Sequence, residues 1–380
     1  MRIVIKIGSS SLNLPQGGLD DAAIARIVQA TAQLKASEVD VVIVSSGAVA
    51  AGMGQLKRTD RPIHLTDRQA AAAVGQSVLM ESYTHLLARK NLVGAQVLLS
   101  RLDLADPARY INAQNTLERL LLWGVVPIIN ENDTVAVEEL NIGDNDTLSA
   151  LVAGLAHADL LFILTDVDGL YTANPRHDEQ ARIIAQVDDV GQVWSLAGGA
   201  GSMLGTGGMV TKLKAAEIVT RFGIGMILMN ANKIERLPDV VSGEVREGTC
   251  FQPQKHRLAG RKRWIAYAGL SEGTVTVDQG AANALLHEGK SLLASGIAGI
   301  DGAWERHELV RVTDPSGQGI ARGLVALSSQ EILRVKGMHS EELLREIPDL
   351  RSPEIIHRDY MTVMPEGLNS RESGGKMSSP

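Results

Sequence analysis

Short apolar runs alternate with longer amphipathic stretches from the first residues to about Asn232, and this alternation limits the possible folds more than any other feature. Six runs rich in β-branched residues are strand candidates: RIVIKI, VDVVIVS, GAQVLLS, VVPIIN, DLLFILTD and GIGMILMN. Their nearly continuous hydrophobicity is typical of strands that are covered on both faces. The pattern predicts an α/β fold with a mostly parallel open sheet sandwiched between helices, in which ligands bind at the carboxyl ends of the strands.

The sequence changes character after residue 250. From Trp264 to about Val335, short segments rich in valine and threonine alternate with glycine-containing turns, which predicts a small β-rich domain. We expect an α/β domain over 1–250, a linker over 251–262, the β-rich domain over 263–345 and a C-terminal extension over 346–380. Because its end lacks apolar periodicity, the extension is expected to be largely disordered after residue 365.

The composition narrows the class of protein. The 380 residues are 44% hydrophobic and 21% charged, which suits an ordinary globular chain, and the formal net charge of -7 argues against a dedicated nucleic-acid coat protein. A single cysteine, Cys250, excludes an internal disulfide and fits a reducing cytoplasm. The start lacks the features of a signal peptide, and no apolar run is long enough to span a membrane. These observations predict a cytoplasmic small-molecule enzyme.

Two strand ends run into small hydroxyl and glycine residues. Lys6 interrupts the first strand and precedes GSSS, and the second strand ends in Ser45, Ser46 and Gly47 before a helix. Turns of this kind can bind an anion through backbone N–H groups, with lysine adding a positive charge. The same residues also suit a solvated strand end or close packing, so the pattern alone leaves both interpretations open.

A third candidate is the glycine-rich loop GGAGSMLGTGGMVTKLKAAEI, which enters an amphipathic helix with Lys212 in its first turns. A flexible surface linker is the alternative, but the lysine pair and the helix favour a cradle for a nucleotide. The loop is not a P-loop, because threonine rather than glycine precedes Lys212.

The segment after the strand VVPIIN carries many carboxylates and amides. Three interpretations compete: a metal cage, a general acid–base pair, or a clamp for a positively charged small molecule. The calcium-loop spacing fails after Asp146, and no histidine or cysteine lies between Asn112 and Gly154, which argues against a metal cage. The other two interpretations remain open at this point.

Taken together, VIKIGSSSL, VSSGAVAAG, AAAAVGQSVLM, INENDTVAVEELNIGDNDTLSA, LTDVDGLYTANPR and GTGGMVTKLKAAEI resemble the amino acid kinase family. The similarity runs in order from about residue 1 to 250, and it is closest to the branch that phosphorylates the side-chain carboxylate of L-glutamate with ATP. The later β-rich segment resembles a PUA domain. The resemblance implies a transferase that makes L-glutamyl 5-phosphate in the first step of proline biosynthesis.

The resemblance also implies roles for single residues. Lys6 and Lys212 would flank the transferred phosphoryl group, and Asp146 would hold the two lysines in position. Asp133 would pair with the α-ammonium of glutamate, within a set of substrate-binding residues that comprises Ser46, Asn130, Asp133 and Asn145. The implied ATP-binding residues are Lys6, Gly8, Ser9, Thr165, Asp166, Thr206, Gly207, Gly208, Met209, Val210, Thr211 and Lys212. Mg²⁺ would accompany ATP, and no protein metal site is expected.

Further partners follow from the same resemblance. They are proline as a feedback inhibitor, glutamyl-phosphate reductase as a downstream partner, and identical chains in a dimer or tetramer. RNA binding through the PUA-like domain is a further possibility, and no membrane association is expected. The alternative function is a catalytically inactive kinase fold that senses an amino acid or binds RNA, but the joint presence of Lys6, Asp146 and Lys212 argues against it.

Overall fold

The computed structural model divides the chain into two compact units, Met1–Leu258 and Ala259–Pro380. The structure describes all residues except 15–17, 59–63, 101–102, 105, 136–144, 176, 198–207, 255–264, 266–270, 272, 349, 351 and 365–380. Each unit has its own hydrophobic core among the described residues. Within the described part of the chain, no helix is long and apolar enough to cross a membrane.

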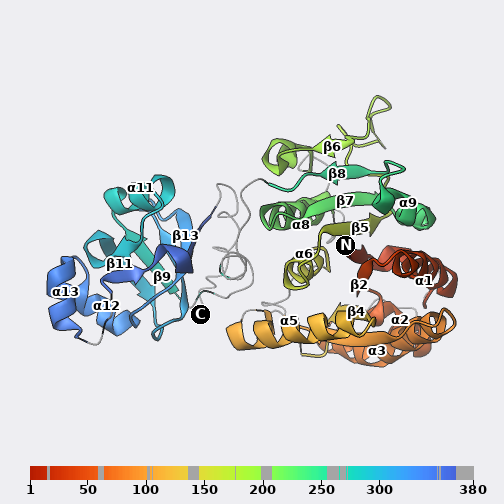
Figure 1. Ribbon diagram of the computed structural model, residues 1–380, viewed down its shortest axis with the longest axis horizontal. Helices are drawn as coiled ribbons and strands as arrows, with labels where there is room; N and C mark the ends of the chain where they lie inside the picture. Colours follow the sequence, from red (N-terminus) through yellow and green to blue (C-terminus); the bar gives the residue numbers. More distant parts are fainter. Residues whose placement is uncertain are drawn as a thin grey trace. The chain divides into compact units, whose positions relative to one another are not determined.

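The first unit is built on one sheet with the strand order β3-β4-β2-β1-β5-β7-β8-β6 (Figure 1). The strands are β1 (Arg2–Ile7), β2 (Asp40–Ser45), β3 (Gly94–Leu99), β4 (Val126–Glu131), β5 (Leu160–Thr165), β6 (Gln186–Val187), β7 (Gly225–Asn230) and β8 (Thr249–Phe251). The six strands from β3 to β7 in this order pair in parallel, whereas β8 pairs antiparallel to β7. The predicted α/β class and mostly parallel sheet are confirmed.

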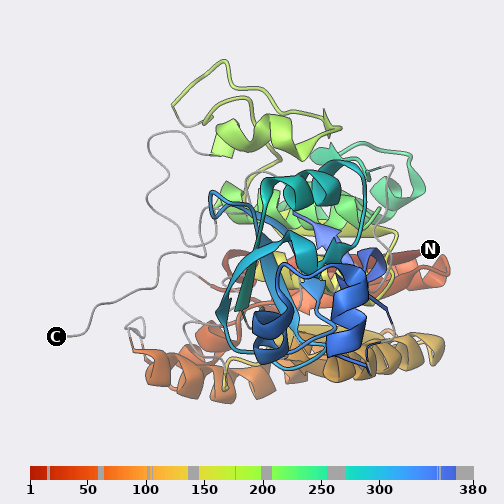
Figure 2. The same cartoon turned by 90° about the vertical axis from the view of Figure 1, so that its left-hand side faces the viewer.

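Helices cover both faces of this sheet. They are α1 (Asp21–Ala36), α2 (Ala48–Gln55), α3 (Leu65–Ala88), α5 (Pro107–Leu122), α6 (Asn145–Leu155), α7 (Trp194–Ala197), α8 (Met209–Arg221) and α9 (Leu237–Ser242). Figure 1 shows α6 and α8 on one side of the sheet and α1 and α9 on the other. In Figures 1 and 2, α3 and α5 lie along the same margin of this unit, and Figure 1 shows β4 beside them.

The first helix, α1, begins at an aspartate that caps it. The Asp20 carboxylate accepts hydrogen bonds from the backbone N–H groups of Ala22 and Ala23, both at 3.0 Å, so Asp20 caps α1. Satisfying these otherwise unpaired groups stabilises the helix start. One face of the helix is buried, with residues at helical spacing: Ile24, Ile27, Val28, Thr31 and Leu34.

The second unit is β-rich, as predicted. Its larger sheet has the order β11-β9-β12-β13-β15, and a separate pair joins β10 and β14. The strands are β9 (Gly273–Val277), β10 (Leu292–Leu293), β11 (Ile297–Gly302), β12 (Leu309–Thr313), β13 (Gly319–Leu324), β14 (Glu354–Ile356) and β15 (Met361–Val363). The helices are α11 (Gln279–His287), α12 (Ser329–Val335) and α13 (Ser340–Glu346).

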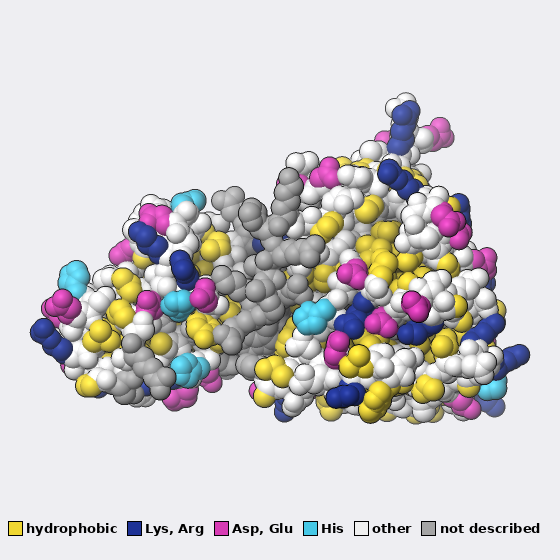
Figure 3. All heavy atoms as spheres, in the orientation of Figure 1, with side chains coloured by type: hydrophobic (Ala, Val, Ile, Leu, Met, Phe, Trp, Pro, Cys, Tyr) yellow, Lys and Arg dark blue, Asp and Glu magenta, His cyan; other side chains and the backbone are white. Residues whose placement is uncertain are grey.

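The surface charges of the two units are mixed. On the face in Figure 3, lysine and arginine side chains lie interspersed with aspartate and glutamate over the described parts of both units. Such a surface creates no strong field of one sign there. In contrast, the interior of the first unit contains a buried cluster of charged side chains, Lys6, Asp146 and Lys212.

Candidate active site

Lys6 lies near the carboxyl end of β1. At this strand the order in which the chain adds strands to the sheet reverses. The chain adds β2, β4 and β3 on one side of β1 and returns with β5 and β7 on the other. Such a switch point opens a crevice at the carboxyl ends of the strands, where ligands bind in open α/β sheets. The side chains of Ile3, Ile5 and Ile7 belong to the core on the α1 side, so strand alternation directs Lys6 to the α6 and α8 side.

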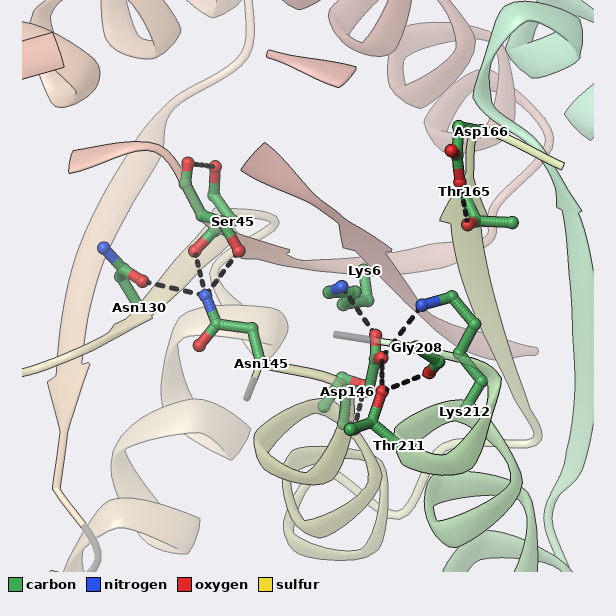
Figure 4. A network of polar contacts seen from close by, with 12 residues as sticks. Lys6, Ser45, Asn130, Asn145, Asp146, Thr165, Asp166, Gly208, Thr211 and Lys212 are labelled. Carbon is green, nitrogen blue, oxygen red and sulfur yellow. Dashed lines mark hydrogen bonds and ion pairs between the residues drawn. The ribbon is translucent and has the colours of Figure 1, made fainter. Parts of the chain in front are cut away.

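Asp146, in the first turn of α6, joins two lysines into a buried ion cluster (Figure 4). Its Oδ1 lies 2.5 Å from Lys6 Nζ, and its Oδ2 lies 3.2 Å from Lys212 Nζ. All three residues are at most 7% exposed. Burial alone would raise the pKa of the Asp146 carboxyl group, but the two lysine charges outweigh burial and lower it. Two cations share one anion, so the cluster presents an excess positive charge.

The start of α8 supplies the second lysine and a further contact to Asp146. Thr211 Oγ1 lies 2.7 Å from Asp146 Oδ2 and 2.8 Å from the carbonyl oxygen of Gly208. Met209 and Val210 form the first turn of α8 with Thr211 and Lys212. Through Thr211, the end of the glycine-rich loop is therefore hydrogen-bonded to the same carboxylate that pairs with Lys6.

Gly8 and Ser9 follow Lys6 at the end of β1. A Cβ atom at Gly8 would lie 3.5 Å from Lys6 Nζ, in ordinary van der Waals contact, so the backbone of Gly8 runs close beside the ammonium group. Ser9 is exposed and begins a 3₁₀ turn over Ser9–Ser11. An anion held by Lys6 would meet this turn.

Asn145 directly precedes Asp146 and reaches in another direction, toward the end of β2. Its Nδ2 lies 2.5 Å from Ser46 Oγ, 3.2 Å from the Ser45 carbonyl oxygen and 3.3 Å from Asn130 Oδ1. Ser45 Oγ is hydrogen-bonded at 3.2 Å to the hydroxyl group of Tyr83, whose pKa burial raises to about 12. The start of α6 thus separates a polar cluster at Asn145 from the ion cluster at Asp146.

Asn130 and Asp133 lie at and just after the carboxyl end of β4. Asn130 is 3% exposed, and its Nδ2 donates a 2.9 Å hydrogen bond to Gln76 Oε1. Asp133 is partly buried, and burial raises the pKa of its carboxyl group although the charge of Arg68 acts in the opposite direction. A raised carboxyl pKa indicates an anion whose burial is not offset by nearby cations. Asp133 is therefore suited to receive a cationic ligand group.

Thr165 is the last residue of β5, on the other side of β1, and Asp166 directly follows the strand. Thr165 Oγ1 donates a 3.0 Å hydrogen bond to Asp166 Oδ1, and the following turn is held by Asn230, whose Nδ2 donates to Asp168 Oδ1 at 3.0 Å. In the view of Figure 4, the ion cluster lies between this pair and the Asn145 cluster. Two polar regions therefore flank one cationic centre.

The site residues predicted from the sequence fall into three groups: the ion cluster at Asp146, the polar cluster at Asn145 and the pair Thr165 and Asp166. The cluster around Lys6, Asp146 and Lys212 includes Thr211 through a contact that the sequence does not reveal. Hydrogen bonds join Ser46, Asn130 and Asn145, while Asp133 follows the strand that carries Asn130. Thr206 and Gly207 lie outside the described residues.

Sequence reasoning missed two supporting contacts from α3. These are the contact of Tyr83 with Ser45 and that of Gln76 with Asn130. The motif AAAAVGQSVLM gives a signal for Gln76, because the glutamine stands in a run that is otherwise mostly small and apolar. Nothing in the sequence signals the contact of Tyr83.

A metal cage is not found in the described part of the chain, where no group of three or more histidine, cysteine, aspartate or glutamate side chains could hold an ion. The cationic centre instead suits a strongly anionic ligand, and the amide and carboxylate cluster suits a ligand with both charges. Transfer of a phosphoryl group between two such ligands fits this arrangement.

Comparisons with known proteins agree with this chemistry. The chain belongs to the amino acid kinase family, whose model matches residues 1–230, and a PUA domain model matches residues 273–347. Within that family it is one of the glutamate 5-kinases. "Glutamate 5-kinase" of Desulfitobacterium hafniense is 62% identical over 365 residues, covering 96% of this chain and 99% of the relative. "Glutamate 5-kinase" of Moorella thermoacetica is 46% identical over 364 residues, covering 96% of each chain.

Among solved structures, UMP kinase from Bacillus anthracis aligns with a TM-score of 0.47 and 15% identity, over 67% of this chain and 96% of that chain.

Proposed function

We propose that this chain transfers the γ-phosphoryl group of ATP to the side-chain carboxylate of L-glutamate and forms L-glutamyl 5-phosphate, the first step of proline biosynthesis. Membership among the glutamate 5-kinases supports this reaction. The structural observation that carries the proposal is the buried Lys6–Asp146–Lys212 cluster, which lies beside the amide cluster of Asn145.

The reaction needs no general base in the protein. The side-chain carboxyl group of glutamate has an ordinary pKa of about 4.3, so it is ionised at neutral pH and can attack the γ-phosphorus directly. A new bond forms between a carboxylate oxygen and phosphorus, and the bond from phosphorus to the ADP oxygen breaks. The obstacle is repulsion between anions, so alignment and cancellation of charge should supply the catalysis.

The three groups of residues divide this work. Lys6 and Lys212 would contact the phosphoryl group in transfer, and Asp146 would keep both ammonium groups at the required separation. Asp133 would bind the α-ammonium of glutamate, while Ser46, Asn130 and Asn145 would bind the rest of its backbone. Amides suit this task because they both donate and accept hydrogen bonds. Together with Gly8 and Ser9, the nucleotide-binding set would comprise Thr165, Asp166 and residues 206–212.

Mg²⁺ would enter with ATP as part of the substrate. It commonly keeps several waters and is held mainly by phosphate oxygens with one or two carboxylates, so it does not require a cage of protein ligands. The ion would neutralise part of the phosphate charge.

The direct test is to trap the product. Purified protein is incubated with glutamate, ATP and Mg²⁺ in the presence of hydroxylamine, which converts an acyl phosphate into a hydroxamate that gives a coloured iron complex. We expect hydroxamate only when glutamate and ATP are both present, and a much smaller signal with aspartate. ATP hydrolysis without hydroxamate, or no turnover by a folded protein that binds ATP, would contradict the proposed reaction.

The proposed reaction also implies partners for this chain. An acyl phosphate hydrolyses readily, so a reductase that consumes it, glutamyl-phosphate reductase, would be the downstream partner. Proline would act as a feedback inhibitor, and the active form would be a homodimer or homotetramer. The one cysteine, Cys250, is free and fits a cytoplasmic location. RNA binding would belong to the second unit.

A further inference from the structure

The motif AAAAVGQSVLM has no role in the reaction described so far, although it lies on a helix that approaches the glutamate side of the site. It belongs to α3, which packs against α2 with very little space between the two backbones. A Cβ atom at Gly75 would lie only 1.8 Å from the carbonyl oxygen of Ala48, and one at Gly52 would lie 1.8 Å from that of Ala71. Only glycine permits this approach. The contact brings Gln76, the next residue, near the turn that starts α2.

Gln76 is joined to the substrate side by a defined chain of hydrogen bonds. Its Oε1 accepts from Asn130 Nδ2 at 2.9 Å, and Asn130 Oδ1 accepts in turn from Asn145 Nδ2 at 3.3 Å and from the backbone N–H of Glu131 at 2.9 Å. The two acceptor contacts of Asn130 Oδ1 fix the orientation of this amide. The Nδ2 of Asn130 must then face Gln76, and because Nδ2 is a donor, the atom of Gln76 that it meets must be the acceptor Oε1. The other end of the Gln76 amide, Nε2, takes no part in this hydrogen bond.

That free end is buried and lacks a partner. Among the residues that the structure describes, no acceptor is within hydrogen-bond distance of Gln76 Nε2, although the atom is almost completely shielded from water. An unpaired buried donor is costly and uncommon in folded proteins. An acceptor supplied by a ligand would remove this cost, and a carboxylate is the strongest acceptor that an amino acid carries.

We propose that Gln76 is a glutamate-binding residue whose Nε2 donates a hydrogen bond to a carboxylate oxygen of the bound amino acid, while its Oε1 holds Asn130 in position. This inference rests on the proposed function, because it takes glutamate as the ligand. Since the atom is shielded in this structure, the groups that cover it must move before the substrate can reach it. Gln76 contributes binding and orientation, and it takes no part in proton transfer.

Two substitutions separate the two ends of the side chain. Gln76→Glu keeps an oxygen that can accept from Asn130 but replaces the donor with a second oxygen, which repels a substrate carboxylate. Gln76→Met removes both polar ends at similar size and adds no charge. If Nε2 faces the substrate, both variants should raise the glutamate KM about 10-fold or more, with the larger increase in Gln76→Glu. The ATP KM should change by less than about 3-fold.

The control is Gln33→Met, the same substitution at an exposed glutamine on α1. It should leave both KM values unchanged, and thermal unfolding should show that every variant is folded. A Gln76→Glu variant with a near-normal glutamate KM would overturn the proposal, because it would mean that Gln76 only holds Asn130. A folded Gln76→Met variant with an unchanged glutamate KM would also overturn the proposal. Wild-type protein that forms no hydroxamate would instead refute the proposed function, so the two failures are distinguishable.

Discussion

Lys212 reaches Asp146 from α8, whereas Lys6 reaches it from β1, so one carboxylate aligns two cations from separate elements. Because the charge of Lys212 should matter most as the phosphoryl group transfers, Lys212→Ala should lower kcat about 100-fold or more and leave the glutamate KM within a few-fold. Steady-state kinetics measure both. Lys214→Ala is the matched control, since Lys214 is exposed on the same helix. A near-normal kcat in Lys212→Ala would remove Lys212 from the catalytic residues.

Asp133 should behave differently, because a clamp on the α-ammonium acts in the ground state and the transition state alike. Asp133→Asn should raise the glutamate KM far more than it lowers kcat, and the exposed Asp188→Asn should change neither. Burial raises the pKa of Asp133, so the wild-type KM should increase as the pH falls, at a higher pH than an ordinary aspartate would give. The asparagine variant should lack this part of the pH profile. If glutamate saturation is the same in both proteins, Asp133 is not the clamp.

Asp146 should also control stability. Removing its charge leaves two buried lysines without their anion, so Asp146→Asn should lower the free energy of unfolding by about 3 kcal/mol at neutral pH. Because the folded pKa of Asp146 is lowered, this contribution is complete above the unfolded pKa, about 3.9, and is lost as the pH falls through the folded value. Chemical denaturation of both proteins between about pH 3 and pH 7 should show a constant difference that narrows only at the acid end. A difference that already narrows near pH 6 would contradict this assignment.

Between elements, the close contact of α2 with α3 positions the start of the proposed glutamate site. Gly75→Ala would place a methyl group against the Ala48 carbonyl oxygen, so the helices must separate. Although alanine favours a helix by about 1 kcal/mol over glycine, the overpacking should dominate and lower the free energy of unfolding by about 1–3 kcal/mol. The glutamate KM should rise as well. Ala73→Gly, at an exposed position on α3, controls for helix propensity, and equal kinetics in Gly75→Ala and wild type would show that the spacing does not matter.

The elements differ in how far the sequence predicts them. The six long apolar runs become the six parallel strands, because burial on both faces leaves a strong local pattern. The sequence does not predict β6 and β8, since strands of two and three residues depend on their partners rather than on a pattern of their own. Motif resemblance identifies Lys6, Asp146 and Lys212, which the structure brings together. The contact of Tyr83 with Ser45 could not be predicted, because it depends on how closely α3 packs. For Gln76 the sequence gives only the signal of a polar residue in a mostly small and apolar run, and its partner Asn130 follows from the packing.

Across the whole chain, the described site residues all belong to the first unit. The last strand of that unit, β8, pairs with both β7 and β6, and residues just beyond it are still tied to the unit. The backbone N–H of Gln252 donates to Val187 O at 2.9 Å, and that of Gln254 donates to Thr220 O at 2.8 Å. A truncation that preserves these bonds leaves the sheet intact.

A chain that ends after Gln254 should therefore fold and keep hydroxamate-forming activity with glutamate and ATP. The domain that it lacks has its own core, and no residue assigned to the reaction lies in it. Loss of that domain can still change assembly or the proposed inhibition by proline, because a domain can modulate a neighbouring site that it does not enter. Activity, proline inhibition and oligomer size should be measured in parallel on the full-length and truncated proteins, with ATP binding as the test of folding. A truncated protein that binds ATP but makes no hydroxamate would show that the second unit completes the active site, and the proposed confinement of both substrate sites to residues 1–250 would be wrong.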